Sequence, residues 1–183
     1  MIHCILIIII IEIVLSFLIV VKLELTNIDI MHSFELLELC NDIICKEGSL
    51  YTLYKEYNSI IFDDYFKYIS FSDNDYKRNK ICSSDYVDIY LICWKNGQKS
   101  KIHDHPDRGC VMYVLDGELK ENIYYSTQKD NIEYGKFNIL INGESSYNHG
   151  SSILHQIVAL RDTVSLHIYH KDYIPKYYDV NTT

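Results

Sequence analysis

The stretch that decides the fold is residues 97–117, which read GQKSKIHDHPDRGCVMYVLDG. His103 and His105 stand two residues apart, in a segment whose flanks alternate like strands. Successive side chains of a strand point to opposite faces, so both imidazoles can face one interior while Asp104 faces away. Their backbones would lie about 7 Å apart, since a strand rises about 3.3 Å per residue. Two inward histidines predict a metal site that needs a third ligand, for which His155 in SILHQIVAL is the candidate.

The ligand type alone leaves open which metal this site would hold. Neutral imidazole suits iron, zinc, copper and nickel, and three histidines plus water also form the ligand set of zinc hydrolases and hydratases. The alternative without a metal is that His103 and His105 are merely polar strand residues. We expect the competing histidines, His149 and His170, to lie at the surface.

Length and composition predict one domain with a sizeable core. The chain has 183 residues, of which 48% are hydrophobic, and its 17 tyrosines and only two prolines favour β-rich structure. The net charge of −8, with no cluster of Lys and Arg, makes nucleic acid an unexpected partner. The six cysteines show no CxxC motif and no regular spacing, which indicates reduced thiols of a cytoplasmic protein rather than a disulfide scaffold.

The N-terminal residues 2–21 form an apolar run that is long enough to span a bilayer. Glu12, near its centre, opposes insertion by about 2.5–3.5 kcal/mol. The basic segment and small-residue cleavage site of a signal peptide are not evident. We therefore expect residues 1–30 to be an apolar extension, either a membrane anchor or a stretch that is not part of the working protein, and residues 31–183 to be the folded domain.

The first half of the domain shows helical periodicity. Apolar residues at three- and four-residue spacing predict a helix over residues 33–46, with Ser33 as N-cap and Gly48 at its end. Leu36 stands where the Glu or Gln of a capping box would be, so that motif is incomplete. Shorter helices are predicted over residues 50–58 and 62–69, where they would shield one end of a barrel.

Beyond Arg78 the pattern changes towards a period of two residues, which is typical of strands. Turn signals follow at regular short intervals, including Asp116-Gly117 and Arg161-Asp162, each of which we expect to join two strands into a hairpin. Many short strands with such turns predict a sandwich or barrel. The predicted strands are residues 86–94, 111–115, 118–125, 137–141, 153–160 and 163–170.

The central stretch resembles the first motif of the cupin superfamily. That motif runs from Gly97 over five residues to His103-x-His105, then over four residues to a position that is usually Glu, then over six to Gly117. Here the usual Glu is replaced by Cys110, and this departure is itself the pattern of thiol dioxygenases of the cysteine dioxygenase type.

Two further segments, YKRN at residues 76–79 and SLHIY at residues 165–169, resemble other motifs of that family. His155 falls where the family has its third iron ligand, and Met31 begins a segment that resembles an ordinary start for the family. The resemblance covers residues 76–169, about half of the chain. It implies a mainly β fold, a cupin-type antiparallel β-barrel of the jelly-roll kind, with a few N-terminal helices.

The resemblance also implies the chemistry of the site. Fe(II) held by His103, His105 and His155 would oxidise L-cysteine with O2 to cysteine sulfinic acid, a step of cysteine catabolism and taurine biosynthesis. Arg78 would clamp the substrate carboxylate with its planar guanidinium, and Tyr76 would add a hydroxyl. An Arg at this position resembles the cysteine-selective members more than those that act on mercaptopropionate.

The family carries a thioether between a cysteine and a tyrosine, and Cys110 and Tyr169 stand at the matching positions. Ser165 and His167 share a strand face with Tyr169 and would form a hydrogen-bonded relay that ends at its phenol. The alternatives are a buried cysteine packed as a small hydrophobe and a solvated polar strand face. Trp94 matches a tryptophan of the family near the site, with core packing as its other role.

We expect a cytoplasmic monomer, or a membrane-anchored one if residues 2–21 insert. Two other functions stay open, namely a three-histidine zinc cupin that acts as a hydrolase or isomerase, and a non-catalytic cupin that binds a small ligand. The chain departs from animal members of the family because no proline follows shortly after Tyr169 and the tail beyond it is short. This departure puts in question the segment that would cover the site.

Overall fold

The computed structural model describes residues 28–57, 59–62, 64–126, 131–171 and 173–179. The apolar run at residues 2–21 lies outside the described residues, so the predicted anchor stays a prediction. In the described part of the chain no helix has the length and hydropathy to cross a membrane.

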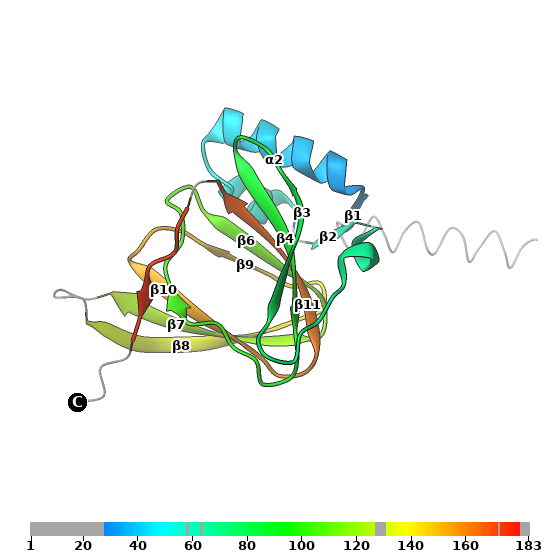
Figure 1. The fold of residues 1–183 in the computed structure, drawn as a ribbon. Helices are drawn as coiled ribbons and strands as arrows, with labels where there is room; N and C mark the ends of the chain where they lie inside the picture. Colours follow the sequence, from blue (N-terminus) through cyan, green and yellow to red (C-terminus); the bar gives the residue numbers. More distant parts are fainter. Residues whose placement is uncertain (1–27, 58, 63, 127–130, 172, 180–183) are drawn as a thin grey trace, which may run out of the picture.

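Two five-stranded antiparallel sheets face each other and make up most of the described chain (Figure 1). One has the strand order β3-β4-β11-β6-β9 and the other β12-β5-β10-β7-β8. The mainly β, cupin-like fold is confirmed, although hydrogen bonds between the described strands do not close the two sheets into one barrel. The bounds are β3 Lys77–Ser83, β4 Val87–Trp94, β5 Ile102–His103, β6 Cys110–Asp116, β7 Glu118–Ser126, β8 Ile132–Ile141, β9 Ser145–Asn148, β10 Ile153–Ala159, β11 Thr163–His170 and β12 Tyr177–Tyr178.

The helical part precedes the sheets. It contains α2 (Ser33–Glu47), α3 (Tyr51–Glu56) and a short 3₁₀ helix, η1 (Tyr65–Tyr68), where the sequence predicts three helices. Two further strands, β1 (Ile28–Met31) and β2 (Ser59–Phe62), pair in parallel.

The start of α2 corrects one prediction. The N-cap is His32 rather than Ser33, because Glu35 lies three residues after His32 and its Oε2 accepts the His32 backbone N–H at 2.7 Å. The expected end at Gly48 is confirmed by its left-handed backbone (φ 71°) and by its N–H, which donates to the carbonyl of Ile44 at 2.9 Å.

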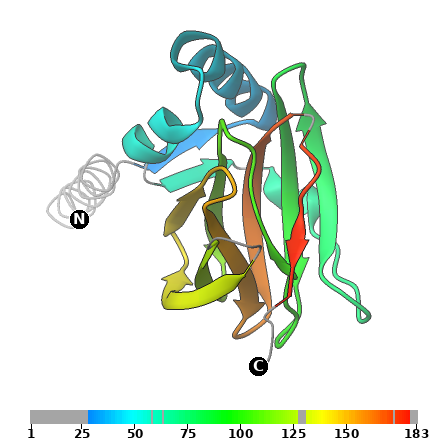
Figure 2. The same cartoon turned by 90° about the vertical axis from the view of Figure 1, so that its left-hand side faces the viewer.

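Helices α2 and α3 cover the outer face of the β3-β4-β11-β6-β9 sheet, and both views show them on the side away from β8 (Figures 1 and 2). Leu36 and Ile44 of α2 pack there with Leu91 of β4 and Leu166 of β11. The inner face of the same sheet packs against the second sheet in a separate cluster that includes Trp94.

Strand β11 is therefore buried on both of its faces. Leu166 and Ile168 point towards the helices, while Ser165 and His167, which are 0% and 3% exposed, point between the sheets. The alternative that Ser165 and His167 lie on a solvent-exposed face of the strand is therefore excluded.

The two predicted hairpins are wrong. Strands β6 and β7 follow each other at Gly117 but lie in different sheets, and so do β10 and β11 on either side of Arg161. The two connections between the sheets contact each other. Arg161 donates to the Gly117 carbonyl at 3.2 Å, and the Glu118 N–H donates to Thr163 Oγ1 at 3.0 Å. A turn signal shows where the chain changes direction, but it does not show which sheet receives the next strand.

Other strands differ in extent. The predictions for β4, β6, β7, β10 and β11 hold to within one residue at each end, whereas β8 begins five residues earlier than the predicted residue 137. Strands β5 and β12 have two residues each and β9 reads SSYN, so none of them carries a periodic apolar pattern that could be recognised.

We predict that Gly117→Ala lowers the free energy of unfolding by more than about 3 kcal/mol. Gly117 has φ 106°, and an added Cβ would come within 2.6 Å of the Thr163 Cα, which is backbone and cannot move aside cheaply. The matched control is Gly97→Ala. There φ is 83° and an added Cβ would meet no atom within 4 Å, so that only the backbone cost of about 1–2 kcal/mol applies. If urea unfolding shows that the two variants lose the same free energy of unfolding, the close contact between Gly117 and Thr163 is not the cause.

Candidate metal centre

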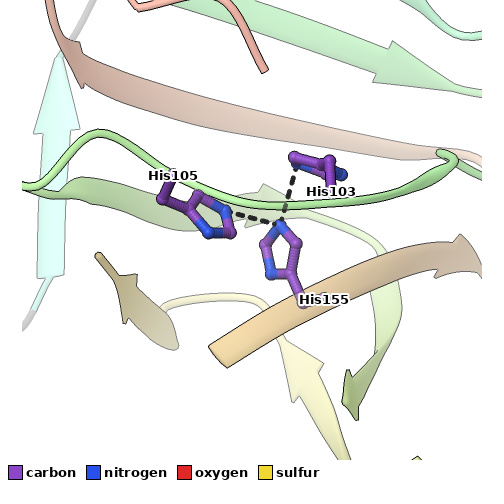
Figure 3. Close-up of side chains that lie close together, drawn as sticks. All are labelled: His103, His105 and His155. Atoms are coloured by element: carbon purple, nitrogen blue, oxygen red, sulfur yellow. Dashed lines mark hydrogen bonds between the residues drawn. The ribbon is translucent and has the colours of Figure 1, made fainter. Parts of the chain in front are cut away.

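Three histidines that lie up to 52 residues apart in the chain bring their side chains together (Figure 3). The Nε2 atom of His155 is 3.0 Å from Nε2 of His105 and 3.2 Å from Nε2 of His103. His105 and His155 are 3% and 4% exposed, while His103 is partly exposed. A search of the described residues for His, Cys, Asp and Glu side chains that could together hold a metal ion finds these three histidines.

The strands position two of the three directly. His103 of β5 and His155 of β10 are register partners in an antiparallel pair, so their side chains share one face. The expected strand through both His103 and His105 is only half right, because β5 ends at His103. His105 reaches the cluster from the following loop, where its backbone N–H donates to the Gly150 carbonyl at 3.0 Å.

Hydrogen bonds behind the rings determine where the protons are. The Nδ1 atom of His103 lies 2.8 Å from the Lys101 carbonyl, and Nδ1 of His155 lies 2.8 Å from Oε1 of Glu121. Both partners are acceptors, so Nδ1 carries the proton in each ring and Nε2 is left with a lone pair.

The donor set therefore fits a divalent ion. Lone pairs on Nε2 of His103 and His155 face each other at 3.2 Å, a repulsive arrangement that a cation between them would reverse. Two imidazole nitrogens bound to one ion at right angles lie about 3 Å apart, since metal–nitrogen distances are about 2.1 Å. Burial, reinforced by His155, lowers the pKa of His103 to about 3. Burial and the neighbouring histidines also lower the pKa of His105, so both rings are neutral at pH 7.

Glu121 of β7 is part of this centre and was missed in the sequence. It is 1% exposed, and its Oε1 accepts hydrogen bonds from His155 (2.8 Å), Ser146 (2.7 Å) and Asn148 (2.9 Å). Burial alone would raise the pKa of Glu121, but the hydrogen bond and the electrostatic interaction with His155, together with the hydrogen bonds from Ser146 and Asn148, outweigh it and bring the pKa to about 2. In the sequence, Glu121 could have been recognised as a charged residue on the same face of its strand as the apolar Leu119.

Asp104 faces away from the histidines, as alternation predicts, and is not a member of the cluster. It is 7% exposed and accepts hydrogen bonds from the Tyr173 hydroxyl, from the Lys176 backbone N–H at 2.7 Å and from the Tyr178 hydroxyl at 3.3 Å. Strand β12 also pairs with β5, so this carboxylate and a short ladder hold the C-terminal segment against the site.

The β11 side chains for which the sequence predicts a relay are linked by hydrogen bonds. The Trp94 indole donates to Ser165 Oγ at 2.9 Å, Ser165 Oγ lies 2.9 Å from His167 Nε2, and His167 Nδ1 lies 3.1 Å from the Tyr169 hydroxyl. Among the described residues, His167 Nε2 is the acceptor that remains for the Ser165 proton. His167 Nδ1 then carries the ring proton and donates to the phenol oxygen, so that the Tyr169 O–H donates to another group.

Cys110 of β6 and Tyr169 of β11 are register partners on adjacent strands, and their side chains are in hydrogen-bonding contact. Burial raises the pKa of the Cys110 thiol, and burial together with Cys110 raises the pKa of the Tyr169 phenol. Both groups are therefore protonated at neutral pH.

A pocket of about 80 Å³ opens beside His103 and Tyr169. The guanidinium of Arg78 lies at its wall, 4.7 Å from the ring centre of Tyr90 and 4.9 Å from that of Tyr169. Tyr173 and Pro175 of the short tail and His170, which we expected at the surface, also line this pocket.

Tyr76 does not line the pocket. Its ring stacks on Trp94, with ring centres 4.3 Å apart and an interplanar angle of 21°. Trp94 is 2% exposed, so it belongs to the core and also donates to the relay. His149 is exposed, as expected, and lies outside the histidine cluster.

Comparison with known families matches residues 31–181 to Cysteine dioxygenase type I. Cysteine dioxygenase type 1 of Bos taurus is 32% identical over 108 residues, which are 56% of this chain and 54% of the relative. Cysteine dioxygenase type 1 of Danio rerio is 30% identical over 114 residues, which are 58% of this chain and 56% of the relative. The matches thus span about half the length of these curated relatives.

Among solved structures, an uncharacterized conserved protein with a double-stranded beta-helix domain from Klebsiella pneumoniae has a TM-score of 0.50 and 14% identity. The match covers 62% of this chain and 87% of that chain. At this identity the likeness concerns the fold alone.

We predict that the metal-free protein loses stability as the pH falls from about 6.5 towards 3. His103 has a folded pKa of about 3 against an ordinary value of 6.5, so the unfolded chain binds more protons between these values. Stability is therefore complete above about pH 6.5 and declines below it, by an amount of the order of a few kcal/mol. His103→Gln is expected to flatten this decline in urea unfolding, while His149→Gln, at an exposed site, leaves it unchanged. A decline equally steep in both variants would contradict the assignment.

We also predict that Asp104→Ala loosens the C-terminal segment. A hydrogen bond to a charged acceptor contributes about 1.5–3 kcal/mol, so hydrogen exchange at the Lys176 amide should become at least about tenfold faster. Asp107→Ala is the matched control, because Asp107 is an exposed acid in the same loop. Unchanged exchange in Asp104→Ala would show that the β12 ladder alone holds the segment.

Proposed function

The chain belongs to the cysteine dioxygenase type I family, and on this premise we propose that it is a thiol dioxygenase acting on L-cysteine. The reaction adds both atoms of O2 to the thiol sulfur and yields cysteine sulfinic acid, so that sulfur loses the four electrons that O2 gains. The observation that carries the proposal is the convergence of three imidazoles beside a pocket that Arg78 and Tyr169 also line.

His103, His105 and His155 would hold Fe(II). When bound, this ion supplies open coordination positions for a thiolate and for O2, and it is the redox partner of the reaction. The three ligands are neutral, so the charge of the ion remains to attract the anionic thiolate. The chain itself excludes bulk water, because His105 and His155 are almost completely buried.

Arg78 would orient the substrate. Its guanidinium lies against the rings of Tyr90 and Tyr169, and the ion pairs found among the described residues do not include it. An unpaired guanidinium at the wall of a pocket is suited to a bidentate contact with the carboxylate of cysteine. The predicted contact of Tyr76 with the same end of the substrate has no support from the pocket, because Tyr76 stacks on Trp94 and does not line that pocket.

Tyr169 would hold a proton towards the reacting oxygen atoms. Ser165 and His167 fix the phenol from behind, and the direction of these hydrogen bonds leaves the phenol O–H as a donor, which Cys110 contacts when no substrate is bound. A thioether to Cys110 would restrict the ring further. Its formation joins sulfur to a ring carbon and releases two protons and two electrons, which O2 accepts.

The setting of this activity is also a proposal. The described cysteines Cys40, Cys45, Cys82, Cys93 and Cys110 are free thiols, which supports a reducing compartment. We assign the enzyme to the cytoplasm as a monomer, with L-cysteine and O2 as its substrates and a role in cysteine catabolism and taurine biosynthesis.

We predict that the full chain, loaded anaerobically with Fe(II), converts cysteine and O2 to cysteine plus two oxygen atoms in mass spectrometry. Cysteamine and 3-mercaptopropionate are run in parallel, and oxygen-18 gas shows the source of both atoms. Arg78→Ala should lower kcat/KM for cysteine about 10- to 150-fold, the value of one charged hydrogen-bonded contact. It should leave cysteamine unaffected, because cysteamine has no carboxylate.

Lys80→Ala is the control for the charge on β3, because Lys80 pairs with Asp88 at 2.7 Å and does not line the pocket. Absence of any oxidised thiol, with iron shown to be bound, would overturn the proposal. The zinc hydrolase or isomerase then becomes the stronger candidate, because a carboxylate behind a histidine ligand, as with Glu121 and His155, is also the usual arrangement at zinc sites.

A further inference from the structure

A buried carboxylate lies directly behind the histidine cluster and takes no part in the reaction proposed above. Glu121 is separated from the centre of the cluster by the ring of His155, whose Nδ1 is 2.8 Å from Glu121 Oε1 and whose Nε2 points at the other histidines. Ser146 and Asn148 donate to the same oxygen, and Asn138 donates to Oε2 at 3.2 Å.

The charge of Glu121 has no permanently charged partner. Among the ion pairs formed by the described residues it faces the Nδ1 atom of His155, and no Lys or Arg pairs with it. A buried carboxylate without a counter-charge is costly, even with several hydrogen bonds. A divalent ion at His155 Nε2 would supply that counter-charge across one ring.

The three ligands are not equivalent in this respect. The Nδ1 atom of His103 donates to the backbone carbonyl of Lys101, and Nδ1 of His105 is buried without a hydrogen-bond partner among the described residues. Only His155 is backed by a charged acceptor. A carboxylate in this position makes the ring a stronger donor to a metal, and it favours the more highly charged ion.

We propose that Glu121 is the positioning residue and the counter-charge of the metal centre. It holds His155 as the Nδ1–H tautomer, directs Nε2 at the ion and gives an otherwise neutral ligand set one negative charge. Its loss weakens metal binding in general and weakens Fe(III) more than Fe(II). The inference rests on the proposed function only in requiring a metal at the three histidines, and not on the reaction.

The first test measures Co(II) affinity of the metal-stripped full chain by competition with a chelator. Glu121→Gln keeps the shape and one acceptor oxygen but removes the charge, and we expect Co(II) to bind about 10- to 100-fold more weakly. Glu133→Gln removes an equal charge at an exposed position of β8 and should not change the affinity. A change of less than twofold in Glu121→Gln would overturn the proposal, whether or not the protein oxidises thiols.

The second test distinguishes a role of the charge from a merely structural one. The Fe(III)/Fe(II) potential of Glu121→Gln should rise, by about 59 mV for each tenfold selective loss of Fe(III) affinity. An unchanged potential, with both ions weakened equally, would overturn the counter-charge role. If Glu121→Gln does not fold, Ser146→Ala replaces it, because it removes one donor to Glu121 and keeps the charge. A drop in Co(II) affinity of at least threefold then supports the proposal, and no drop overturns it.

Discussion

The rings of His103 and His155 face each other across two adjacent strands with their unprotonated nitrogens 3.2 Å apart. This contact is unfavourable between two lone pairs, and the surrounding chain is built to maintain it. The Lys101 carbonyl and the Glu121 carboxylate hold the ring protons on the far side, and burial keeps the His103 ring neutral. The groups behind the rings thus orient the Nε2 lone pairs towards the place that a cation would occupy.

The sheet β3-β4-β11-β6-β9 contributes the remainder of the site, with Arg78 from β3, Cys110 from β6 and three further side chains from β11. Strand β11 lies between β4 and β6, so its register with them fixes Ser165, His167 and Tyr169 along one line and sets Tyr169 beside Cys110. The helices press on the other face of this strand through Leu166 and its neighbours. Strand β11 therefore joins the helix-covered core on one face to the side chains of the candidate site on the other.

Local patterns in the sequence were sufficient for those features that depend on local geometry. Periodicity located α2 and five of the strands, and motif spacing identified His103, His105 and His155, which the structure brings together. Sheet membership could not be predicted, because a turn such as Asp116-Gly117 is compatible with a hairpin or with a crossing to the facing sheet. Glu121 was missed since its partner His155 lies 34 residues away, and the clue, a charge on an apolar phase, becomes meaningful only once the strands are paired.

The order of the ligands along the chain bears on how the protein is synthesised. His103 and His105 leave the ribosome first, and β10 with His155 follows only after β6 to β9 have been made. The tail that Asp104 holds comes last. Among the described strands β5 pairs with β10 and β12, so His103 has no strand partner until β10 has been made. The cluster of three imidazoles can therefore form only after residue 155 has been synthesised.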